Sequence, residues 1–207
     1  MRRVRHYGDT GQALPIYVVV VGGLLFLAFA YLAVGQAAAN RSDTQTAADA
    51  AALAVALEDR DVLAAGWLEN VLDPAEWQDY LDGNALVGGP ACGRASRLAA
   101  RNEADLGQCY SPEPLRYMVE VTSREPVGDT IVPGTESRHS TASATAVIEP
   151  RCTFDEPGEE AQEEVPEEAA EETLPALVCG DEEWELDPED LSDLPGPEDL
   201  FDVHLAD

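Results

Sequence analysis

The sequence predicts an α+β protein whose single N-terminal transmembrane helix continues into a long exposed helix and then into a small disulfide-bearing ectodomain. Three features predict this fold: an uncharged apolar run over residues 14–35, a change from helical to alternating periodicity after Pro114, and four cysteines that all follow the apolar run. Helices that precede strands favour a short antiparallel sheet with the helices packed on it. A disordered acidic loop is expected to interrupt this ectodomain.

The apolar run is the first element. About 20 apolar residues are enough to cross the hydrocarbon core of a bilayer, and residues 14–35 carry no charge. Residues 1–13 hold three arginines against one aspartate, which predicts a cytoplasmic N-terminus and an extracellular C-terminal domain. A signal peptide cleaved after Ala39 is the alternative. Because the run exceeds the usual signal core of about 7–15 residues, a retained single-pass anchor in the cell membrane is favoured.

The chain beyond the apolar run keeps a helical character. Residues 36–59 contain no proline or glycine and are dominated by alanine, the strongest helix former. We therefore expect an Ala-rich helical extension with an exposed surface. Residues 60–82 predict one or two short helices, with Pro74 at a first helical position, and residues 91–106 return to helical spacing.

Strands are predicted in the second half of the chain. Residues 115–124 alternate between apolar and polar side chains, and residues 138–149 repeat this pattern. A third strand is expected at residues 200–205, close to the end of the sequence. The small α+β ectodomain is accordingly assigned to residues 60–152.

Acidic side chains dominate the last quarter of the chain. Residues 153–178 are the predicted acidic disordered loop, and residues 179–207 are an acidic segment that returns with the final strand. A net charge of -29 repels nucleic acid and anionic headgroups, so neither is an expected ligand of the ectodomain. The acids of the loop come as Glu-Glu pairs without the alternating Asp/Asn and central Gly of a calcium loop, so no dedicated metal site is expected.

The four cysteines predict two disulfide bonds, because all of them lie on the exported side of the apolar run. Four cysteines allow three connectivities. We favour Cys92–Cys109 and Cys152–Cys179, since each of these pairs closes a local segment. The sequence contains neither a CxxC motif nor a histidine at ligand spacing, which favours structural bridges over zinc or redox chemistry.

No catalytic constellation is evident. The histidines are His6, His139 and His204, and the acids are too numerous for any pair to carry information. No phosphate-cradling glycine loop and no nucleophile elbow is present. We expect a protein that is not an enzyme and that has no catalytic residues and no cofactor.

The junction between the apolar run and the ectodomain carries the most specific pattern. An arginine and a glutamine lead from the apolar run into an AADAAALA segment. The residues of this pattern are Gly11, Pro15, Gly35, Arg41, Gln45, Asp49 and Leu53. Residues 8–58 resemble the N-terminal module of the TadE/TadG-like proteins of the tight-adherence (Flp) pilus assembly system, in which an apolar helix is followed by these residue types at these spacings.

The resemblance implies a membrane-anchored, pilin-like accessory protein of Flp/Tad-type pilus assembly or secretion that acts by helix packing and protein contacts. Its implied partners are the membrane, pilus or secretion platform proteins, and a second copy through the N-terminal helix. Ala33 stands where many members of the family carry an aspartate. Ala13 and Ile16 stand where related prepilins carry a glutamate, five residues after the cleaved glycine, which argues against processing by a prepilin peptidase.

Two other functions are compatible with the sequence. An independent surface-exposed adhesion or binding module would use the apolar helix as a passive anchor. A secreted acidic protein would result if a signal peptidase removed the residues before Asn40. The position of the mature N-terminus distinguishes the secreted protein from the two membrane-anchored forms.

The acidic loop generates the first testable prediction. We expect deletion of residues 155–172 to leave folding and membrane insertion intact, because so acidic a segment buries little apolar surface. Membrane fractionation and limited proteolysis of the ectodomain measure both properties. A collapse of protease resistance in the deletion variant would contradict this expectation.

Overall fold

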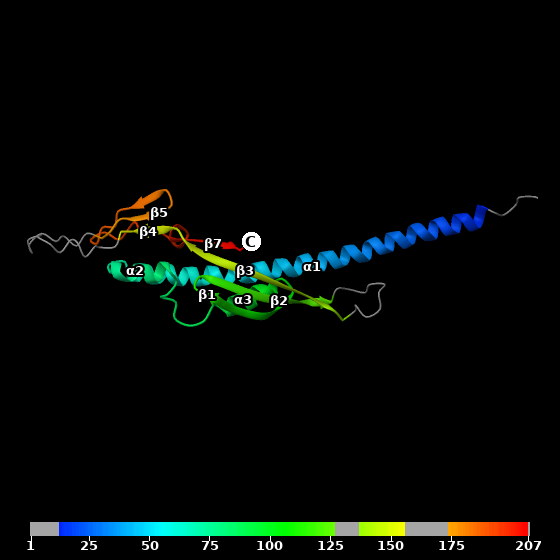
Figure 1. Cartoon of the computed structure of the whole chain (residues 1–207), viewed down its shortest axis with the longest axis horizontal. Coiled ribbons are helices and arrows are strands. Elements are labelled where there is room, and N and C mark those ends of the chain that lie inside the picture. The colour runs from blue at the N-terminus through cyan, green and yellow to red at the C-terminus, as the bar shows by residue number, and fades with distance from the viewer. Residues whose placement is uncertain (1–12, 127–136, 156–173, 207) are drawn as a thin grey trace, which may run out of the picture.

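The computed structural model describes residues 13–126, 137–155 and 174–206. A single long helix, α1 (Ala13–Glu69), runs through the whole molecule. The remaining elements gather around its second half and form a head, while its first half projects alone (Figure 1). The acidic loop predicted from the sequence falls largely on residues 156–173, which lie outside the described residues.

Helix α1 is continuous over 57 residues, about 85 Å at 1.5 Å per residue. The expected short helices of residues 60–82 are corrected in part, because residues 60–69 continue α1. Only α2 (Pro74–Leu81) is separate, and Pro74 occupies its first turn as predicted. The apolar N-terminal helix of the sequence analysis is confirmed, and its end is set by the turn at residues 70–73.

The main sheet has four antiparallel strands in the order β1-β2-β3-β7. These strands are β1 (Ala104–Glu113), β2 (Arg116–Pro126), β3 (His139–Pro150) and β7 (Phe201–Leu205). Strands β2 and β3 fall where alternation predicts them, and β7 falls on the third strand expected at residues 200–205. In β2 the alternate residues Tyr117, Val119 and Val121 are buried, so one face of the sheet covers α1.

The expectation that the Ala-rich extension is exposed is wrong for one of its faces. Ala47, Ala48, Ala51, Ala52 and Val55 are all 0% exposed. They lie under the sheet, and α1 packs closely on both β2 and β3. Alanine has only a methyl group as its side chain, so the backbones of helix and sheet approach closely along this face.

Helix α3 (Cys92–Arg101) packs beside α1 and ends three residues before β1. Glu103 adopts a positive φ of 57°, which turns the chain from the helix into the strand. The helical periodicity predicted up to residue 106 therefore stops early, and β1 was not predicted. The disulfide Cys92–Cys109, with Cα atoms 5.9 Å apart, joins α3 to β1.

A second, smaller sheet has the order β4-β5-β6 and was not predicted from the sequence. Its strands are β4 (Cys152–Phe154), β5 (Leu177–Cys179) and β6 (Glu182–Trp184). Cys152 and Cys179 are directly opposite each other and form the second disulfide. Both favoured cysteine pairings are thus confirmed, and the second one closes the base of the acidic segment.

An aromatic cluster holds the far end of α1 to the rest of the head. The ring centroids of Trp67 and Trp77 lie 5.2 Å apart, and those of Trp77 and Phe154 lie 5.1 Å apart. The indole Nε1 of Trp77 donates a hydrogen bond to the carbonyl of Asn70, at 3.3 Å. The cluster therefore joins α1, α2 and the small sheet in one core.

The burial of the Ala-rich face gives a stability prediction. Replacing Ala51 with leucine should destabilise the head by about 1–3 kcal/mol, because the added side chain overpacks a position that is fully buried between helix and sheet. Chemical unfolding of the full chain in detergent, followed by tryptophan fluorescence, measures the change. Ala65→Leu, at an exposed position of the same helix, is the control and should be neutral. Equal stability of both variants would contradict the packing described here.

Candidate functional site

Most of the exposed large hydrophobic side chains among the described residues lie on the projecting half of α1. Among the described residues, one helix is long and apolar enough to cross a membrane. An 18-residue window of this helix, Pro15–Leu32, has a mean hydropathy of 2.3. None of this window is buried against the protein itself. Large side chains such as Phe26 and Tyr31 are 66% and 80% exposed. This half therefore fits a membrane anchor.

A band of polar contacts marks the point where α1 enters the head. The amide of Gln45 donates to Oδ1 of Asp49 at 2.8 Å and to the carbonyl of Ser143 in β3 at 3.2 Å. One turn earlier, the side chain of Asn40 accepts a hydrogen bond from the hydroxyl of Ser140. These contacts fix the helix against β3 at the edge of the buried alanine face.

The residues of the predicted motif divide into two groups. Gln45, Asp49 and Leu53 make contacts within the protein, since Leu53 packs half-buried against the core. The others behave differently: Pro15, Gly35 and Arg41 are exposed, and Gly11 lies outside the described residues. A Cβ atom added at Gly35 would meet nothing within 4 Å, so this glycine serves no close approach inside the molecule.

A groove of about 420 Å³ runs between α1 and α3. Its floor includes Leu53 and Leu57 of α1, and its rim holds Arg94, Arg97 and Arg101 of α3. Arg94 pairs with Glu58 at 3.4 Å, whereas Arg97 and Arg101 form no ion pair within the described residues. Glu58 and Asp61 also line the groove, so it brings arginines and acids together.

Asp59 of α1 is a buried acid that sequence reasoning missed, because acids are too frequent in this chain to be informative singly. Only 6% of the residue is exposed. Burial raises the pKa of its carboxyl, against the opposing effects of the Tyr117 hydroxyl and the backbone of Ala91. Burial and the nearby Asp59 charge also raise the pKa of Tyr117, whose hydroxyl lacks a partner at hydrogen-bond geometry among the described residues.

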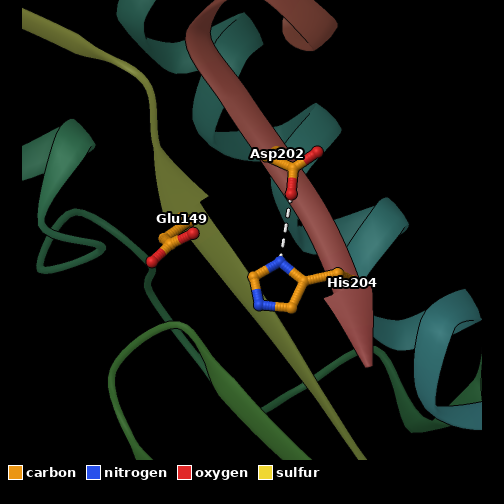
Figure 2. A group of neighbouring side chains, drawn as sticks. All are labelled: Glu149, Asp202 and His204. Carbon is orange, nitrogen blue, oxygen red and sulfur yellow. Dashed lines mark hydrogen bonds and ion pairs between the residues drawn. The ribbon is translucent and has the colours of Figure 1, made fainter. Parts of the chain in front are cut away.

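A group of metal-ligating side chains lies on the exposed surface of the main sheet. Glu149, Asp202 and His204 come together at the pairing of β3 with β7 (Figure 2). No metal site is predicted from the sequence, because these residues are distant in the chain and only the strand register makes them neighbours. The Asp-x-His spacing within a predicted strand was the available signal.

These features define a class of protein: an apolar helix fitted to a membrane, with a disulfide-bonded antiparallel-sheet head built on its second half. Residues 11–58 match a family model described as "Putative Flp pilus-assembly TadE/G-like". The match confirms the resemblance to the TadE/TadG-like proteins and covers α1 from its start to the residue before Asp59. No curated protein and no solved structure matches the chain.

The raised pKa of Asp59 gives a prediction on pH dependence. A carboxyl with a raised folded-state pKa favours folding below its unfolded pKa of about 3.9, and this contribution is lost as pH rises through the folded-state value. Near neutral pH, well above the unfolded-state pKa, the buried carboxyl of Asp59 therefore lowers stability, a cost that an uncharged asparagine avoids. Asp59→Asn should raise Tm there, and the difference should shrink toward about pH 4.

Thermal unfolding of the full chain in detergent, repeated across this pH range, measures the effect. Asp43→Asn, at an exposed position of the same helix, is the matched control and should follow the wild type. A lower Tm for Asp59→Asn than for the wild type at neutral pH would contradict the argument.

Proposed function

We propose that the chain is a membrane-anchored, pilin-like accessory protein of Flp/Tad-type pilus assembly or secretion, acting by helix packing and protein contacts. The observation that carries this proposal is α1, whose apolar half is exposed while its second half is fixed inside the head. The family match over residues 11–58 supports the pilus assembly system as the setting.

The proposed topology places the N-terminus in the cytoplasm and the head outside the cell. Three arginines in residues 1–13 support this orientation. Two disulfide bonds in the head also support it, because such bonds persist in oxidising compartments. The localisation we propose is thus a single-pass protein of the cell membrane.

The exposed half of α1 has features that suit lateral contact with other helices. Gly22 and Gly23 lie in the membrane window, and a Cβ atom added at either would meet nothing within 4 Å. Small residues allow the backbones of membrane helices to approach closely. Self-association and contact with platform proteins would both use this surface.

The head restricts which surfaces remain for partners. Its own sheet covers the alanine face of α1, so this face is not open to a neighbouring protein. Contacts outside the membrane would use the other sides of the helix and the groove between α1 and α3. We propose a role in contact and not in turnover of a substrate.

Photo-crosslinking in cells tests the proposal. A benzoylphenylalanine placed singly at successive positions of residues 17–32 should form protein adducts at intervals of three or four residues, because one side of a helix meets the partner. Mass spectrometry of the adducts identifies a second copy or a pilus assembly protein. The same probe at Val87, fully exposed in a loop of the head, is the control for random collision.

Two outcomes would contradict the proposal. Absence of protein adducts at every position of the apolar half would favour a passive anchor for an adhesion module. A mature chain that begins at Asn40 and is found in the medium would favour a secreted protein.

A further inference from the structure

We propose that Glu149, Asp202 and His204 form a binding site for a divalent transition-metal ion, for which Zn²⁺ is the best fit. The three ligand atoms lie within 4.8 Å of one another, and all three side chains are exposed. Figure 2 shows them converging over the junction of β3 and β7. The site is independent of the proposed role in pilus assembly.

Strand register builds the site. In the antiparallel pair, Glu149 lies opposite Asp202, and Val147 lies opposite His204. Alternate residues of a strand point to the same face, so Asp202 and His204 share a face of β7. Ile148 directly precedes Glu149 and Phe201 directly precedes Asp202, and both are buried on the side of α1. The three ligands therefore occupy the opposite, solvent-facing side.

The backbone that carries these residues is held at both ends. The amide of Arg151 donates to the carbonyl of Leu200 at 2.9 Å, just beyond the Glu149–Asp202 pair. At the other end, the amide of Ala206 donates to the carbonyl of Thr145 at 2.8 Å. The Cα atoms of the three ligands thus start from fixed positions, which lowers the entropy lost when an ion binds.

The present distances are close to those of a metal site. Nδ1 of His204 lies 3.0 Å from Oδ2 of Asp202. Zinc binds nitrogen and oxygen ligands at about 2.0–2.2 Å, so two ligands of one ion are separated by roughly 3–3.5 Å. An ion between His204 and Asp202 takes the place of the proton that they share, and a rotamer change brings Glu149 into the same shell.

The donor set selects the kind of ion. An imidazole nitrogen suits zinc, copper, iron and nickel, whereas calcium and magnesium prefer shells made of oxygen. Two carboxylates add negative charge that a divalent cation neutralises. Three protein ligands leave one position of a tetrahedron open for water. The imidazole of His204 distinguishes this site from the purely acidic surfaces of the chain.

Titration of the full chain in detergent with Zn²⁺, followed by calorimetry, tests the site. We expect one Zn²⁺ ion to bind above the weak background that the acidic surface gives with Ca²⁺ or Mg²⁺. His204→Ala and Glu149→Gln should each weaken this binding by at least about tenfold. Co²⁺ as a spectroscopic probe should give ligand-field bands in the wild type that His204→Ala loses.

His139→Ala is the matched control, because His139 is an exposed histidine of β3, the strand that carries Glu149, and its Nδ1 lies 2.8 Å from the carbonyl oxygen of Ser123. This variant should bind Zn²⁺ like the wild type. Circular dichroism of each variant checks that the sheet stays folded. The proposal is wrong if His204→Ala and Glu149→Gln retain wild-type affinity for Zn²⁺, or if the wild type binds Zn²⁺ no better than Ca²⁺.

Discussion

Close packing between the alanine face of α1 and the main sheet is the contact on which the rest of the head depends. Ala47, Ala51 and their neighbours are fully buried, and the strands that cover them supply the larger apolar side chains, such as Val119 and Ile148. Alanine favours the helix, and its small side chain lets the sheet approach closely. The smaller sheet and α2 then attach at the end of α1 through Trp67 and Trp77.

One helix therefore serves two environments without a break. Its first half offers apolar side chains outward on every side, and its second half buries the face that holds Ala47, Ala51 and Val55. The matched family segment, residues 11–58, contains both halves. In this protein Gln45 and Asp49 stand at the boundary, where their hydrogen bonds tie the helix to β3. These two residues of the motif thus connect the apolar helix to the head.

Much of the fold could be predicted from local patterns. The apolar run, the alternation of β2 and β3 and the cysteine pairs are properties of short segments. Strand β1 was missed because most of its residues are exposed and its pairing with β2 shifts register twice, so it does not alternate. Strands β4, β5 and β6 have three residues each, too few to show a period.

The sequence by itself determined the elements whose cause is local: where the helix is apolar, where the strands alternate and which cysteines close short segments. Only the tertiary structure decided which surfaces meet. It placed the alanine face under the sheet, buried Asp59 beside Tyr117, and brought Glu149 next to Asp202 and His204. The physical reason is that these contacts join residues distant in the chain. Strand register and helix rotation decide which of these residues meet, and no local pattern specifies either one.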